Sequence, residues 1–211
     1  MALTAETALV NIALVRIGED PLNDLQNQSG KVADVMRVAF EPSRDSLLRS
    51  YRWNFAIGRA ALAASGSPTF GFVNSFTIPD DCLHVVGLFD AGEDMRNYTS
   101  SKIPFKVEGR SLLCDEDIAY VYYIKSVTNV RLFDPIFIDA LAWKLGIDTA
   151  YGLTTGADHV SNCWKGFKEV MRYAKLANAI EGSTEVVEAS EWLDARAAGG
   201  PGPFRAGPIN S

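Results

Sequence analysis

The sequence predicts an α+β protein in which helices from both ends of the chain form a bundle around an inserted, mainly antiparallel β-sheet. Apolar residues recur at helical spacing before residue 50 and after residue 134. Between residues 72 and 127 the pattern changes to short β-type runs separated by turn residues. After Arg196 the chain is mostly Gly, Pro and Ala, which predicts an extended C-terminal arm. The expected parts are N-terminal helices at 1–63, the β-sheet subdomain at 64–130, C-terminal helices at 131–182 and the arm at 183–211.

The composition is globular with an acidic balance. The chain has 211 residues, which is long enough to bury a sizeable core without disulfides or metals. Its formal net charge is −6. Phosphate binding needs a surplus of Lys and Arg, so this charge argues against a protein that coats nucleic acid. The negative charge does not exclude a protein that forms the wall of a channel for DNA, where attraction to phosphates would be a disadvantage.

Cysteine usage and hydropathy indicate an intracellular protein. Cys82, Cys114 and Cys163 form no CxxC pair, which predicts reduced thiols. No run approaches the roughly 18 apolar residues that a membrane-spanning helix requires. We therefore expect a soluble protein, or part of an assembly built inside a cell.

The first expected helix spans residues 4–17. Thr4 is its expected N-cap, and Gly18 follows its end as a C′ residue. The N-terminal run has no basic start and is interrupted by Glu6 and Arg16. It therefore reads as an amphipathic helix rather than a signal peptide.

The second expected helix spans residues 30–50, with Ser29 as its candidate N-cap. Pro42 lies inside it. Proline removes one hydrogen bond of the helix and clashes with the carbonyl four residues before it. We expect a kink at residues 38–41, or two abutting helices.

The segment "YRWNFAIGRAALA", Tyr51–Ala63, is expected to be extended and then helical. It places the rings of Tyr51, Trp53 and Phe55 within five residues. Such rings can close the protein's own core, form a protein interface, or stack on single-stranded nucleic acid. Their position between a helix and the predicted sheet favours the first of these. Trp53 and Phe55 are then a buried wedge at the hinge between two subdomains.

Arginines surround this aromatic segment. Five of them stand against two acids (Arg37, Arg44, Arg49, Arg52 and Arg59 against Glu41 and Asp45). Arg is enriched at protein interfaces. Arg52 and Arg59 are expected on the outer side of the wedge, as candidates for contacts between subunits.

The middle of the chain predicts four or five strands with short connections, which favours antiparallel pairing. The runs are "FVNSFTI", "CLHVVGLFD", "FKVEGRSLLCD" and "IAYVYYIKSV". The third predicts a hairpin that turns at Glu108-Gly109. The aromatic fourth run predicts a central strand.

Two more helices are expected after the sheet. Asp134 followed by Pro135 is typical of an N-cap and first helical position. The run "IFIDALAWKLGIDTAY" is apolar on nearly every side, which predicts a buried helix. Residues 158–181 keep apolar 3–4 spacing and predict a long amphipathic helix that ends at Gly182.

The sequence offers little for catalysis. No GxGxxG, P-loop, HExxH or GxSxG motif occurs. His84 is expected as a half-buried strand residue and His159 as a residue of a helix's first turn. The acids of "IPDDC", "DAGED" and "CDEDIA" fall at predicted turns, where Asp bonds the local backbone. We therefore expect no catalytic residue, no cofactor and no metal site.

Several stretches, in this order, resemble the tail tubular protein A family, the head-to-tail adaptors of short-tailed bacteriophages. The main match is "FEPSRDSLLRSYRWNFAIGRAALA", preceded by "NIALVRIGEDPLNDL". "IPDDCLHVVGL", "VEGRSLLCDED", "FDPIFIDALAWKLGIDTAYGLT" and "EGSTEVVEASEWLDAR" follow. The resemblance covers about residues 8–196; the tail after Arg196 has no counterpart in it.

The resemblance implies a structural virion protein without catalysis. Members form a ring, usually of twelve copies, that joins the portal protein to the tail nozzle protein and continues the channel for genomic double-stranded DNA. The family fold is a helical bundle with a β-sheet domain. The implied location is the neck of the virion, after assembly in the host cytoplasm, with no membrane.

The expected contact residues combine this resemblance with aromatic and Arg anchors. They are Arg52, Arg59, Trp192, Leu193, Arg196 and Phe204. Two alternatives stay open. One is a small-ligand-binding or enzymatic domain that uses the Arg/Trp cluster at residues 49–59. The other is a monomeric helical interaction module.

Overall fold

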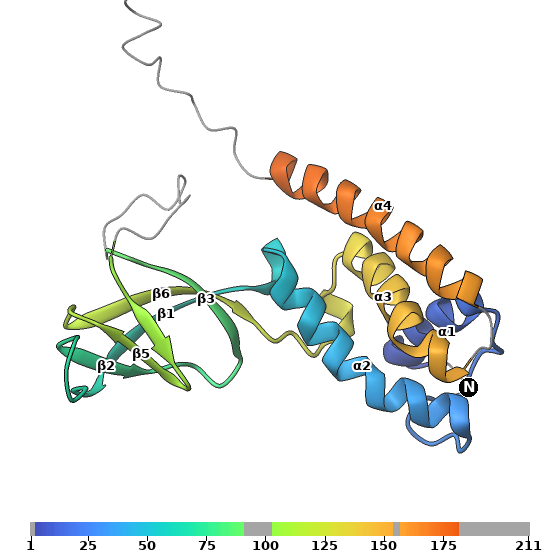
Figure 1. Cartoon of the computed structure of the whole chain (residues 1–211), viewed down its shortest axis with the longest axis horizontal. Helices are drawn as coiled ribbons and strands as arrows, with labels where there is room; N and C mark the ends of the chain where they lie inside the picture. The colour runs from blue at the N-terminus through green and yellow to red at the C-terminus, as the bar shows by residue number, and fades with distance from the viewer. Residues whose placement is uncertain (1–2, 91–102, 154–156, 182–211) are drawn as a thin grey trace, which may run out of the picture.

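The structure, a computed structural model, describes residues 3–90, 103–153 and 157–181. Within these ranges it has four α-helices and six strands, so the α+β class is confirmed. The helices gather at one end of the long axis and the sheet at the other, with α2 leading from one to the other (Figure 1). The helices are α1 (Ala5–Ile17), α2 (Lys31–Ser50), α3 (Pro135–Leu153) and α4 (Ala157–Glu181), and the 3₁₀ turns are η1 (Asn54–Ala56) and η3 (Val130–Leu132). The strands are β1 (Ile57–Gly66), β2 (Asn74–Thr77), β3 (Cys82–Phe89), β4 (Lys106–Glu108), β5 (Ser111–Cys114) and β6 (Ile118–Lys125).

Both ends of α1 match the sequence prediction. The Thr4 side chain accepts a hydrogen bond from the backbone N–H of Thr7, which satisfies one donor of the first turn. Gly18 ends the helix in the left-handed conformation, at φ 81°, where a residue without Cβ is unstrained. Arg16 in the last turn lies over the ring of Trp143 in α3, at 4.0 Å, and ties the two helices together.

Helix α2 differs from its prediction in two ways. Its N-cap is Gly30, at φ 131° and without a side-chain cap, so the assignment to Ser29 is wrong. One unbroken helix crosses Pro42, so a division into two helices is also wrong. Pro42 is exposed, and Val38, whose carbonyl loses its usual partner, is 77% exposed. Water on this face can satisfy that carbonyl, so the helix continues.

The segment after the aromatic residues is a strand and not a helix. Ile57–Gly66 forms β1, which pairs with β6 on one side and β2 on the other. The register runs from Ile57 opposite Ile124 to Ala63 opposite Ile118. The sheet therefore begins at residue 57, seven residues before the boundary expected at 64.

The sheet has the strand order β3-β6-β1-β2-β5-β4, and each neighbouring pair is antiparallel. β6 lies between β3 and β1, so its prediction as a central strand is confirmed. The predicted hairpin is also present as β4 and β5, with Gly109 at φ 60° in the turn. The sheet encloses its own small core (Phe76, Ile78, Val85, Leu88, Leu112, Cys114, Ala119, Val121 and Tyr123).

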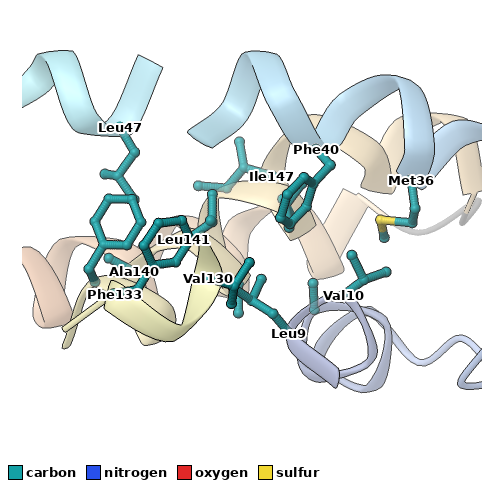
Figure 2. Close-up of a cluster of buried hydrophobic side chains, with 14 of the residues drawn as sticks. Leu9, Val10, Met36, Phe40, Leu47, Val130, Phe133, Ala140, Leu141 and Ile147 are labelled. Carbon is teal, nitrogen blue, oxygen red and sulfur yellow. The ribbon is translucent and has the colours of Figure 1, made fainter. Parts of the chain in front are cut away.

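Helix α3 is the centre of the helical part. Asp134 caps it by accepting the N–H of Ile136 at 2.7 Å, which confirms the predicted start. It contacts α1, α2 and α4. Its buried residues include Phe137, Leu141 and Leu145, as expected for a helix that is apolar on most sides. Side chains from α1, α2 and α3 meet in the core of this part (Figure 2).

Gly146 marks a close approach of three helices. A Cβ there would lie 2.9 Å from Sγ of Cys163 in α4 and 3.2 Å from Cγ2 of Ile17 in α1. Gly146→Ala is therefore expected to lower the free energy of unfolding by about 1–2 kcal/mol, because overpacking exceeds the gain in helix propensity. Gly152→Ala is the matched control, since its nearest atom, Cγ1 of Val35, is 4.0 Å away. In urea unfolding, Gly146→Ala should have a lower free energy of unfolding than the unmodified protein and Gly152→Ala a higher one. Equal changes in both variants would contradict the packing argument.

Candidate functional site

The aromatic segment forms the junction between the helical part and the sheet. α2 ends at Ser50, Tyr51 is extended, and η1 turns the chain into β1. Trp53 is 3% exposed and donates its Nε1–H to the carbonyl of Leu47, at 3.2 Å. Its indole N–H is thus satisfied inside the protein, as a buried Trp requires. The prediction that Trp53 is buried is confirmed.

The rings of this segment pack on rings from the start of α3. The ring centroid of Trp53 lies 5.0 Å from that of Phe137 and 5.3 Å from that of Tyr51, both edge-to-face. The ring centroid of Phe55 lies 5.1 Å from that of Phe137, but Phe55 is half-buried, where the sequence predicted burial. Edge-to-face pairs at these distances are favourable. Of the three interpretations of these rings, the structure supports closure of the core.

A groove opens beside these rings, where α4 passes over them. It has a volume of about 220 Å³ and is lined by Trp53, Asn54, Phe55, Asp134, Ile136, Ala174 and Ala177. We call it the junction groove. Earlier positions of the same α4 face carry Phe167, Val170 and Met171, which pack on the helical core. At Ala174 and Ala177 the same face carries only methyl groups, and this leaves the space of the junction groove.

The interface candidates Arg52 and Arg59 are both exposed but lie on different elements. Arg52 directly precedes Trp53, and Arg59 lies in β1 with its guanidinium 5.9 Å from the ring centre of Tyr122. Neither lines the junction groove. The candidates Trp192, Leu193, Arg196 and Phe204 lie outside the described residues.

His84 in β3 is exposed, where the sequence predicted half-burial. Partial desolvation lowers its pKa, and the positive charges of Arg49 and Arg52 lower it further. The two arginines are therefore near His84, whose lowered pKa favours the neutral imidazole, and Arg49 and Arg52 form a cationic corner at the end of α2. Arg49 also donates to the carbonyl of Leu83, which joins α2 to β3.

Arg44 is a structural residue that the sequence argument did not single out. It is 5% exposed, and it donates to the carboxylate of Asp45 at 2.8 Å and to Glu41 at 3.3 Å. Asp45 also accepts from the hydroxyl of Ser126, at 3.1 Å, just beyond β6. This cluster holds α2 against the end of the sheet. Asp45 and Ser126 are 81 residues apart in sequence, so no local pattern could reveal the contact between α2 and the sheet.

The cysteines are free thiols in the described structure. Cys114 and Cys163 are buried and Cys82 is half-buried. Burial raises the pKa of all three thiols, which disfavours the reactive thiolate at neutral pH. Cys82 is close to His84 in sequence, but its raised pKa is the opposite of what an activated nucleophile needs.

Across residues 3–90, 103–153 and 157–181, no group of three or more His, Cys, Asp or Glu side chains could hold a metal ion. Within the same ranges, no helix combines the length and the apolar character needed to cross a bilayer. A second, shallower hollow of about 410 Å³ lies between residues 68–72 and β4–β5. Phe70 at its side is 87% exposed.

No family model matches the chain, and no curated protein matches it.

Proposed function

We propose that this protein is a structural adaptor of a short-tailed bacteriophage, which forms a ring between the portal and the tail nozzle. The order of the sequence stretches that resemble the tail tubular protein A family supports this proposal. In this reading the four helices act as the bundle of the adaptor and residues 183–211 as its arm. The ring has twelve copies, surrounds genomic double-stranded DNA without specific binding, and resides in the virion neck after assembly in the host cytoplasm.

The observation that carries the proposal furthest is the exposure of large apolar side chains on both ends of the molecule. On α4, Trp164, Tyr173 and Leu176 are 45%, 51% and 56% exposed, with Trp164 half a turn around the helix from Tyr173. At the far end of the sheet, Phe70 and Val73 are 87% and 61% exposed. Exposed apolar side chains are typical of interaction sites where they form one contiguous patch. An adaptor needs such surfaces at opposite ends, because it contacts one partner above and another below.

The net charge of −6 agrees with a channel wall that does not hold DNA. Arg52 and Arg59 are then contacts between neighbouring copies, since both are exposed and lie on the sheet side of the junction. Arg196 and the apolar residues Trp192, Leu193 and Phe204 are the arm's contacts with the portal.

The test is removal of the arm. The variant that lacks residues 183–211 is expected to fold but to add no density to portal rings of the same phage. Electron micrographs of portal rings mixed with each protein provide the measurement, with symmetry compared between the portal and any added ring. The full chain is the positive control, and Tyr151→Ala, an exposed change on α3, is the matched variant. Normal ring addition by the truncated protein would rule out this role for the arm.

A small-ligand site is the second candidate, because the junction groove includes Trp53. Two observations weaken it. The groove volume of about 220 Å³ is below the range of about 300–1,000 Å³ typical of small-molecule sites. Of the cluster at residues 49–59, the groove is lined by Trp53, Asn54 and Phe55 but by none of its arginines. The same micrographs distinguish the adaptor from a monomeric interaction module, because a monomeric module would add no symmetric ring to the portal.

A further inference from the structure

We propose that, in the free protein, the junction groove holds Trp192 and Leu193 of the same chain. The groove is lined mainly by apolar residues and has two polar residues at its lining, Asn54 and Asp134, of which Asp134 brings a carboxylate. Asp134 uses one oxygen to cap α3 through the N–H of Ile136. A carboxylate accepts several hydrogen bonds, so it can also receive one from an indole N–H. The site thus has the chemistry for a Trp side chain, an apolar body with one donor.

The course of the chain brings the candidate occupant to this place. Ala174 and Ala177 line the groove, and α4 ends four residues later at Glu181. The way back along the helix from Glu181 to Ala174 is about 10 Å, at 1.5 Å per residue. The 11 residues from Glu181 to Trp192 can span up to roughly 36–40 Å when extended. Residue 192 therefore reaches the groove of its own chain without help from a second copy.

The size and chemistry of the groove select Trp192 within the C-terminal segment. A volume of about 220 Å³ suits one large side chain and part of a neighbour. Trp192 is the only Trp after residue 181, and Leu193 follows it directly. Phe204 and Ile209 bring apolar surface but no side-chain donor for Asp134. A buried indole is stable only when its N–H finds an acceptor, which the Asp134 carboxylate provides.

Charge supports the same placement. From Glu181 to Asp194 the chain has five acids and no base. The cationic corner of Arg49 and Arg52 lies at this junction, at the end of α2 beside His84. Attraction between these groups offsets the repulsion between the acidic run and Asp134. The inference does not rest on the adaptor proposal, because it concerns the free chain; in a ring, release of Trp192 from the groove would make it available to the portal.

The test places a photoreactive benzophenone amino acid at position 192 of the full chain, at dilute concentration. Irradiation is expected to give a product of monomer mass, with the cross-link on residues 53–55, 134–136 or 174–177. The same probe at position 204 is the control and should not label these peptides. A product of dimer mass would assign the groove to a second copy and overturn the proposal. Labelling elsewhere, or none, would overturn it as well.

A second variant tests the groove from the other side. Ala177→Phe fills the space, and the cross-link from position 192 to the groove is expected to be lost. Leu176→Phe is the matched control, because residue 176 is 56% exposed and adjacent in sequence. Circular dichroism checks that both variants fold; if Ala177→Phe does not, Ala177→Met replaces it. Equal cross-link yields in the filled and control variants would contradict the proposal. Failure of arm-deleted protein to join portals concerns the adaptor role alone and leaves this result unaffected.

Discussion

Replacing Trp53 by Ala is expected to lower the free energy of unfolding by about 3–5 kcal/mol, the usual range for a large buried aromatic residue. The indole is 3% exposed and packs edge-to-face on Tyr51 and Phe137. Truncation leaves a cavity between the end of α2 and the start of α3. It also removes the donor to the carbonyl of Leu47. Because a domain has only about 5–15 kcal/mol of net stability, this is a large share.

Urea unfolding of the full chain, followed by circular dichroism, measures the effect of Trp53→Ala. Two variants separate its causes. Trp53→Phe keeps most of the apolar volume but loses the indole N–H, so an intermediate loss is expected. Trp164→Ala removes an indole that is 45% exposed on α4 and should cost much less. If Trp53→Ala and Trp164→Ala have the same unfolding midpoint, Trp53 does not fix the junction.

This junction shows what a sequence can reveal about the fold. Trp53 could be predicted as buried, because its neighbours are a helix with an apolar stripe on one side and a predicted sheet on the other. The caps at Thr4 and Asp134 could be predicted for a different reason. Cap chemistry is local, so the short side chain and the backbone donor it satisfies lie within three residues of each other.

The error at β1 has the opposite cause. "AIGRAALAASG" is rich in Ala, which favours a helix when only local propensity counts. In the protein this segment has partners on both sides, β6 and β2, and the hydrogen bonds of the sheet outweigh that preference. The small side chains of β1 leave room for side chains of the neighbouring strand, which no local sequence pattern shows. Gly58 lies opposite Tyr123 of β6, and Arg59 and Ala61, on the other face of the sheet, lie opposite Tyr122 and Tyr120.

The candidate site was predictable only in part. The rings and arginines around residue 53 stand out in composition, and the structure places them at one junction. The junction groove could not be predicted, because it depends on where α4 crosses the start of α3. In the sequence, Ala174 and Ala177 are recognisable only as small residues at the end of an amphipathic stripe, which does not predict a groove. The contact between Arg44 and Ser126 could not be predicted either, because the two residues are distant in sequence.

Gly58→Ala is expected to lower the free energy of unfolding by about 1–3 kcal/mol, the usual cost of overpacking. A Cβ at this position would lie 2.6 Å from Cζ and 2.9 Å from both Cε atoms of the Tyr123 ring in β6. Tyr123 is 7% exposed, and its hydroxyl donates to Asp81 at 3.3 Å. The ring cannot move aside without losing this bond and disturbing the sheet core. No gain in helix propensity offsets the cost here, so the loss should exceed that of Gly146→Ala.

The matched control for Gly58→Ala is Gly66→Ala, in the same strand. A Cβ at Gly66 meets no heavy atom within 4 Å, and its φ is not positive, so Ala is unstrained there. Its substitution should leave stability unchanged or raise it slightly, because Ala loses less backbone entropy than Gly on folding. Near-ultraviolet circular dichroism adds a second readout, since a displaced Tyr123 changes the aromatic signal in one variant alone. If both substitutions lower the free energy of unfolding equally, the loss comes from replacing any glycine in β1. In that case the close contact with Tyr123 is not what requires Gly58.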